Sequence, residues 1–137
     1  MPAALRITRA QLDTVFGHAL RYTPEEACGI LAGDADGTVR RVFLVENSEH
    51  SSTFYLMDPG EQFRVFDQIE QDGLELLAIF HSHPHSTAYP SARDCELAFY
   101  PDSFYMIVSL MDREPRSRVF RIREKGVQEA EMVIAGG

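Results

Sequence analysis

The sequence predicts an α/β fold of the mixed α+β kind, with one central mixed β-sheet flanked by helices. A chain of 137 residues fits one domain, because a single core of this size buries enough apolar surface. A hydrophobic fraction of 45% and a charged fraction of 25% are ordinary for a globular protein. Apolar residues alternate between helical spacing and short runs closed by glycine or proline, and no repeat or linker divides residues 1–137.

The first predicted element is a helix that Thr8 can cap and that ends before Pro24. Its apolar residues recur at three- and four-residue spacing, which gives one buried face: Leu12, Val15, Phe16, Ala19 and Leu20. Two antiparallel strands follow at 27–33 and 39–45, joined by a hairpin turn at Asp36-Gly37.

A short aromatic strand is predicted at 53–57, and Asp58-Pro59 then opens a second helix that ends at Gly73. The continuous apolar run at 74–80 indicates a strand buried on both faces. This strand leads directly into His81.

The last third of the chain predicts a helix from Ser91 to about Phe99 and a strand at 104–111. A closing hairpin follows, with strands at 119–123 and 127–134 around Lys125-Gly126. We expect the functional site in the loop after the 74–80 strand, since loops at strand ends carry function on a rigid scaffold.

The charge balance excludes some classes of partner. A net charge of −8 and a pI near 5.0 argue against nucleic-acid binding, which depends on clustered Lys and Arg. No stretch has the roughly 18 apolar residues that span a bilayer, so we expect no membrane partner and a cytoplasmic protein. We expect a monomer or weak homodimer. Cys28 and Cys95 are expected to be reduced, buried thiols.

Residues 81–94 read HSHPHSTAYPSARD and contain the residues of a metal site. In an extended strand, side chains two apart point the same way, so His81 and His83 present both imidazoles to one point. Asp94, three residues into a helix that Ser91 starts, can turn its carboxylate back towards that point. Two nitrogens and one oxygen are the ligand set of a catalytic zinc that keeps a fourth position for water.

A purely structural interpretation competes with this one. Ser91-x-x-Asp94 is also a variant of the capping box, in which the serine and the acid satisfy backbone amides and no metal is needed. If the site is a peptidase, Ser91 can also donate to the carbonyl oxygen during hydrolysis. A carboxylate base is needed as well, and the spacing does not choose between Glu25 and Glu26.

These residues carry a family resemblance. His81-Ser-His83-Pro, followed by Ser91-x-x-Asp94 and preceded by Glu26-Ala-Cys-Gly, resembles the JAMM (MPN+) metalloprotease signature. The resemblance implies an MPN-like, cytidine-deaminase-like domain. It implies that His81, His83 and Asp94 bind Zn²⁺, that Glu26 is the general base and that Ser91 stabilises the oxyanion.

Residues 46–55, 60–62 and 88–91 are similar to segments of one group within the family, the bacterial Mec-type hydrolases. That similarity implies release of cysteine from a ubiquitin-like sulfur carrier protein with a C-terminal Gly-Gly tail. A diglycine tail can thread a narrow groove, and we expect its walls at 53–57 and 84–90, with Thr53, Phe54 and Tyr89 contacting substrate. The alternatives are a general bacterial JAMM deconjugase of ubiquitin-like tails and a non-catalytic MPN-type binding scaffold.

Overall fold

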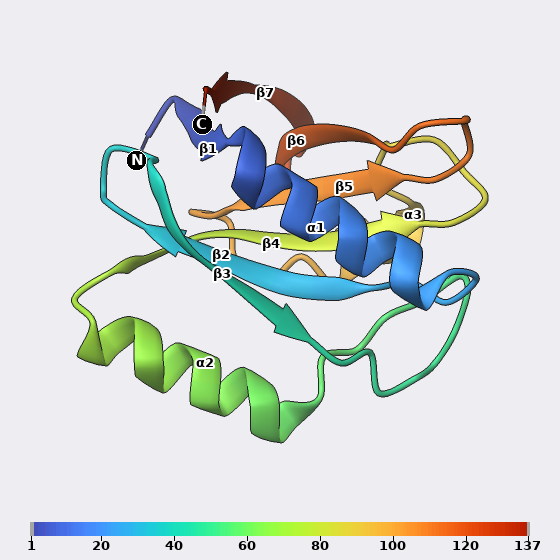
Figure 1. The fold of residues 1–137 in the computed structure, drawn as a ribbon, viewed down its shortest axis with the longest axis horizontal. Helices are drawn as coiled ribbons and strands as arrows, with labels where there is room; N and C mark the ends of the chain where they lie inside the picture. The colour runs from blue at the N-terminus through green and yellow to red at the C-terminus, as the bar shows by residue number, and fades with distance from the viewer. Residues whose placement is uncertain (1, 137) are drawn as a thin grey trace.

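The structure, a computed structural model, describes residues 2–136 and contains one seven-stranded mixed sheet (Figure 1). The strand order across the sheet is β1-β7-β6-β5-β4-β2-β3. The strands are β1 (Ala4–Thr8), β2 (Cys28–Gly33), β3 (Val39–Val45), β4 (Glu75–His83), β5 (Phe104–Ser109), β6 (Arg116–Arg123) and β7 (Gly126–Ala135). The helices are α1 (Arg9–Tyr22), α2 (Pro59–Gln71) and α3 (Ala92–Glu96). The expected α/β class and mixed sheet are therefore confirmed.

The two long helices pack against opposite faces of the sheet, and each covers its own apolar cluster. Leu12, Val15 and Ala19 of α1 join one buried cluster. Ile69 of α2 joins the other, which also contains Cys28 and Ile79. The sheet is thus the middle of three layers, and its central strands are shielded from water on both faces. No helix within residues 2–136 combines the length and apolar composition needed to cross a bilayer.

Local sequence signals explain the starts of these helices. Thr8 caps α1 in a reciprocal capping box with Gln11. Asp58 caps α2 by accepting a hydrogen bond from the Glu61 amide, and Pro59 occupies the first turn. Both predicted helix starts are confirmed.

The centre of the sheet positions the functional residues. β4 pairs antiparallel with β2 and parallel with β5, and its residues from Leu77 onwards are buried. Cys28, the first residue of β2, lies opposite His81 near the carboxyl end of β4. The end of β4 is therefore held on both sides by hydrogen-bonded neighbours.

Five expectations from the sequence are wrong in detail. Residues 4–8 form β1, which pairs parallel with β7, where no strand was predicted. The segment 53–57 is not a strand, and its one backbone bridge joins Met57 to Asn47. β4 continues to His83, and α3 ends at Glu96. Cys95 lies in this short helix and is exposed, while Cys28 is buried as expected.

Candidate metal centre

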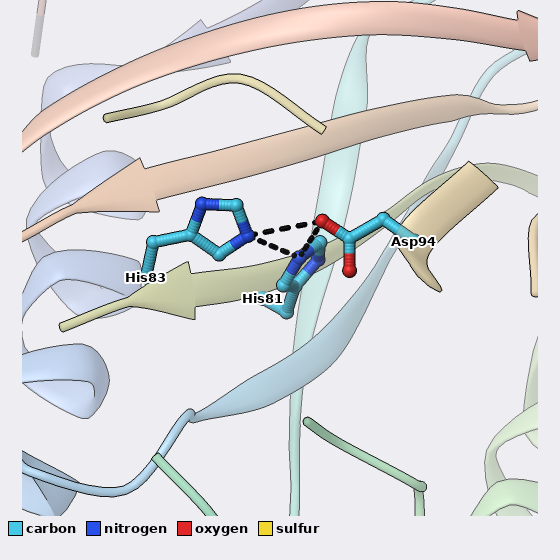
Figure 2. A group of neighbouring side chains, drawn as sticks. All are labelled: His81, His83 and Asp94. Atoms are coloured by element: carbon cyan, nitrogen blue, oxygen red, sulfur yellow. Dashed lines mark hydrogen bonds and ion pairs between the residues drawn. The ribbon is translucent and has the colours of Figure 1, made fainter. Parts of the chain in front are cut away.

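Three of the predicted site residues meet at the carboxyl end of β4 (Figure 2). His81 and His83 come from β4, and Asp94 comes from α3. The His81 Nε2 and His83 Nε2 atoms are 3.1 Å apart. Asp94 Oδ2 lies 3.1 Å from His81 Nε2 and 3.0 Å from His83 Nε2. The three atoms form a nearly equilateral triangle.

The triangle fits a zinc ion. At zinc–ligand distances of about 2.05 Å, two ligands of a tetrahedral site are about 3.3 Å apart. The edges of 3.0 to 3.1 Å are close to this spacing. The unprotonated nitrogen of a neutral imidazole and a carboxylate oxygen are both acceptors, so their contact requires a proton or a cation between them. His81 and His83 are buried, and Asp94 is partly buried.

Neighbouring groups fix the two imidazoles. His83 Nδ1 lies 2.8 Å from the carbonyl oxygen of Thr87. When Nδ1 donates to this carbonyl, Nε2 keeps its lone pair for the shared point, as metal-binding histidines commonly do. The His81 ring stacks on the Tyr55 ring, with centroids 4.5 Å apart and an interplanar angle of 23°. Packing and hydrogen bonding thus aim both Nε2 atoms at Asp94.

The local environment sets the charge of these groups. Burial raises the pKa of the Asp94 carboxyl, but hydrogen bonds from His81 and His83 outweigh it and leave that pKa well below its usual value. Burial lowers the pKa of His81, which favours the neutral imidazole. For His83 burial also opposes the charge, but the hydrogen bond to Asp94 leaves its pKa raised. The ionised Asp94 carboxylate and the neutral His81 imidazole are forms that coordinate metals, whereas a protonated His83 has to lose its proton to do so.

The capping interpretation of Ser91 and Asp94 is also correct. Ser91 Oγ accepts a hydrogen bond from the Asp94 amide at 3.0 Å, and the Ser91 amide donates to Asp94 Oδ2 at 2.9 Å. The same Oδ2 atom faces both histidines. The cap is therefore compatible with a ligand role for Asp94, and it orients the carboxylate.

Glu26 lies immediately before β2, beside the cluster. Cys28 pairs with His81, so the antiparallel register places Glu26 opposite His83 on the same face of the sheet. Its side chain is buried, and Oε1 has no hydrogen-bond partner among the described residues. Burial raises the pKa of its carboxyl to about 8, and the nearby His83 opposes that rise. A carboxylate buried without a partner is costly, which indicates a function.

The structure distinguishes the two candidate bases, Glu25 and Glu26. Glu25 lies away from the cluster, where Oε1 contacts His50 Nδ1 at 3.0 Å in a largely exposed pair. Glu26 is anchored through its backbone, because its amide donates to the Ser51 carbonyl at 2.7 Å. Of the two acids, only Glu26 is next to the proposed ligands.

The predicted substrate-binding residues do not contact the three clustered side chains directly. Thr53 is exposed, and Phe54 is half-buried beneath the Arg93 guanidinium, which lies 4.1 Å from its ring centroid. Tyr89 is 49% exposed and packs edge-on against Phe120. All three lie in the segments expected to form the groove walls.

Four residues near the cluster were not predicted. Tyr55 stacks on His81, and Thr87 accepts from His83. Ser82 Oγ accepts from the Ala27 amide, which ties the Glu26 segment to β4. Asn47 is buried, and its side chain donates to the Glu26 and Phe54 carbonyls. No sequence signal singles out Asn47 within the polar run at 46–52, and none points to the Thr87 carbonyl.

Comparison with known proteins agrees with this geometry. Residues 8–123 match the family described as prokaryotic homologs of the JAB domain. The chain belongs to this JAB family. The match covers most of the sheet and all the clustered residues, and it confirms the JAMM-type resemblance.

This JAB domain has named relatives and a solved structural neighbour. It is 39% identical over 126 residues to the CysO-cysteine peptidase of Mycobacterium tuberculosis, covering 90% of this chain and 86% of that protein. It is 37% identical over 103 residues to the desampylase of Haloferax volcanii, covering 71% and 74%. The solution structure of a Desulfitobacterium hafniense protein superposes with a TM-score of 0.88 and 36% identity, covering 97% of this chain and 94% of that one.

Proposed function

We propose that this JAB domain is a zinc metallopeptidase that hydrolyses the bond after the C-terminal diglycine of a ubiquitin-like protein. Its substrate would be a sulfur carrier protein from which it releases cysteine. The observation that carries the proposal is the triangle of His81, His83 and Asp94 with Glu26 beside it, whose buried Oε1 has no hydrogen-bond partner within residues 2–136. The similarity to a CysO-cysteine peptidase supports both the hydrolase class and the carrier substrate.

Each site residue then has a role. His81, His83 and Asp94 would hold the zinc ion, which would polarise the scissile carbonyl and lower the pKa of water. Glu26 would take a proton from the attacking water and pass it to the leaving amine. Water adds to the carbonyl carbon and the C–N bond breaks, which yields a carrier with a C-terminal carboxylate and free cysteine.

Ser91 would stabilise the developing oxyanion. In the cap, its Oγ uses a lone pair to accept from the Asp94 amide, so its own O–H remains available to donate. An added donor at the carbonyl oxygen stabilises the transition state more than the substrate. The cap would therefore position Ser91 as well as Asp94.

The diglycine tail would lie between the 53–57 and 84–90 segments. Tyr55 is central to the first wall, and among residues 2–136 its backbone N–H and C=O have no hydrogen-bond partner. An extended tail could pair with these groups as an added strand. Phe54 and Tyr89 would flank a tail whose glycines lack side chains that would collide with them.

The test is to incubate zinc-loaded protein with a carrier ending in Gly-Gly-Cys and to follow cysteine by mass spectrometry. Glu26→Gln protein is the matched control, because it keeps the proposed ligands and loses the base. We expect cysteine release by the unchanged protein alone. Absence of hydrolysis of any diglycine conjugate would contradict the proposal.

A general deconjugase of ubiquitin-like tails is the second candidate, and the similarity to a desampylase favours it. The same assay with a diglycine joined to a lysine side chain separates the two. Faster cleavage of the lysine-linked conjugate than of the cysteine-ended carrier would favour the general activity. A non-catalytic scaffold would release neither product.

A further inference from the structure

Arg93 lies between the proposed oxyanion donor Ser91 and the proposed ligand Asp94 on α3. Its guanidinium reaches the other side of the site and lies over the Phe54 ring, 4.1 Å from the centroid. Phe54 precedes Tyr55, whose ring stacks on His81. The contact between Arg93 and Phe54 is therefore close to the cluster. Arg93 is next to Asp94 in the sequence, and Phe54 is next to Tyr55, which packs on His81.

Five exposed arginines of this acidic chain pair with a carboxylate, and Arg93 is not among them: Arg9, Arg40, Arg41, Arg116 and Arg118. Arg118, which lies over Tyr89 on the other proposed wall, is held by two contacts of 3.1 and 2.8 Å to Glu129. No carboxylate oxygen within residues 2–136 lies at ion-pair distance from the Arg93 guanidinium. An arginine held over an aromatic face keeps N–H groups free at its edge for an incoming anion.

We infer that Arg93 binds the C-terminal carboxylate of the amino acid that the enzyme releases, and so selects carriers with one terminal residue after the diglycine. This inference rests on the proposed function. A guanidinium presents a fork of donors that matches a carboxylate, and the pair gains strength where the walls exclude water.

Bond geometry explains why this contact would be selective. In a terminal cysteine, the carboxylate carbon is two bonds from the scissile nitrogen, so its oxygens lie within about 4 Å of that nitrogen. In a diglycine–lysine isopeptide, the scissile nitrogen is followed by four methylene groups and carries no carboxylate nearby. Only the terminal residue therefore brings an anion close to the reacting bond and within reach of an arginine next to Asp94.

A carboxylate could also come from an acidic side chain of the carrier, and substrates that differ at one group separate the two sources. The substrates are one carrier ending in Gly-Gly-Cys, the same carrier ending in Gly-Gly-Cys amide, and its Gly-Gly isopeptide with lysine. The variants are Arg93→Gln, Arg93→Lys and Arg40→Gln. Arg40 is a matched control, because it is exposed and pairs with Asp34 at the far end of the sheet.

For the carboxylate substrate, Arg93→Gln should lower kcat/KM about 10- to 100-fold, mainly through KM, as expected for loss of a charge-assisted hydrogen-bonded pair. Arg93→Lys should recover part of this loss, and Arg40→Gln should have no effect. The amide and the isopeptide should be hydrolysed equally by the Arg93→Gln and unchanged proteins. An equal loss on all three substrates, or no loss on any, would overturn the inference.

Binding gives a readout that does not depend on turnover. The dissociation constants of the carboxylate and amide carriers are measured by calorimetry on Glu26→Gln protein, with and without Arg93→Gln. The inference requires tighter binding of the carboxylate carrier and loss of that preference with Arg93→Gln. If the unchanged protein hydrolyses no conjugate but the carboxylate preference depends on Arg93, the proposed function is rejected and this site is kept. A preference unchanged by Arg93→Gln would reject this site alone.

Discussion

At the residue scale, the site depends on side chains with two tasks each. Ser91 Oγ caps α3 and stands beside the proposed reaction centre, and Asp94 Oδ2 completes the cap while facing both histidines. The sequence predicted the Ser91–Asp94 cap, which the structure confirms, because a short motif fixes residue type and spacing together; the ligand role of Asp94 and the oxyanion role of Ser91 stay predictions. It could not predict the orienting groups from other segments, such as the Thr87 carbonyl and the Tyr55 ring, since these depend on tertiary packing.

Replacement of Ser91 by alanine tests its double role. Ser91→Ala should lower the hydrolysis rate by roughly 10²- to 10³-fold, because an oxyanion donor is lost. It should also lower the free energy of unfolding by about 1 kcal/mol, because a helix cap is lost. Kinetics on a Gly-Gly-Cys carrier and urea denaturation measure the two effects, and zinc content should not change.

Thr8→Ala is the matched control for Ser91→Ala. Thr8 forms the same reciprocal capping box on α1, away from the cluster. Replacement of Thr8 by alanine should lower the free energy of unfolding by a similar amount and leave the hydrolysis rate unchanged. If Ser91→Ala and unchanged protein hydrolyse the carrier at equal rates, Ser91 takes no part in the reaction and serves only as the helix cap.

At the element scale, the connection between β3 and α2 shapes the site without regular secondary structure. Asn47 holds it together: its Nδ2 donates to the Glu26 and Phe54 carbonyls, and its Oδ1 accepts from the Glu49 and Leu56 amides. The aromatic run at 53–57 predicted a strand because its residue types favour one, but side-chain hydrogen bonds from Asn47 satisfy this backbone instead. β1 was missed because its five residues pair along their length with β7, at the opposite end of the sequence.

Asn47→Ala should therefore disturb the Glu26 position more than the metal ligands. The lost bonds leave buried carbonyls unsatisfied, so we expect a loss of roughly 1–3 kcal/mol in unfolding free energy. The hydrolysis rate should fall while zinc content stays that of the unchanged protein. Ser48→Ala serves as control, since its side chain bonds only to the Leu56 carbonyl at an exposed position. Loss of zinc in Asn47→Ala would show that this connection supports the ligands and not Glu26 alone.

At the scale of the whole molecule, a rigid sheet carries the reactive groups. The end of β4 lies between β2 and β5 and between two apolar clusters, so His81 and His83 cannot relax apart easily. Glu26 enters from the neighbouring strand at a register fixed by backbone hydrogen bonds. The sequence predicted this class of fold from its periodicity and strand lengths. Strand order and the missed edge strand required long-range pairing, which one-dimensional patterns do not contain.

The central claim is that His81, His83 and Asp94 form one zinc site that needs all three side chains. The most direct measurement is the zinc content per chain of purified protein, by mass spectrometry of the metal, for unchanged, Glu26→Gln, His83→Ala and Asp94→Ala proteins. The account predicts about one zinc per chain in the first two proteins and almost none in the last two. Zinc retained at full occupancy in folded His83→Ala and Asp94→Ala proteins, or zinc not bound by the unchanged protein even when supplied, would contradict it.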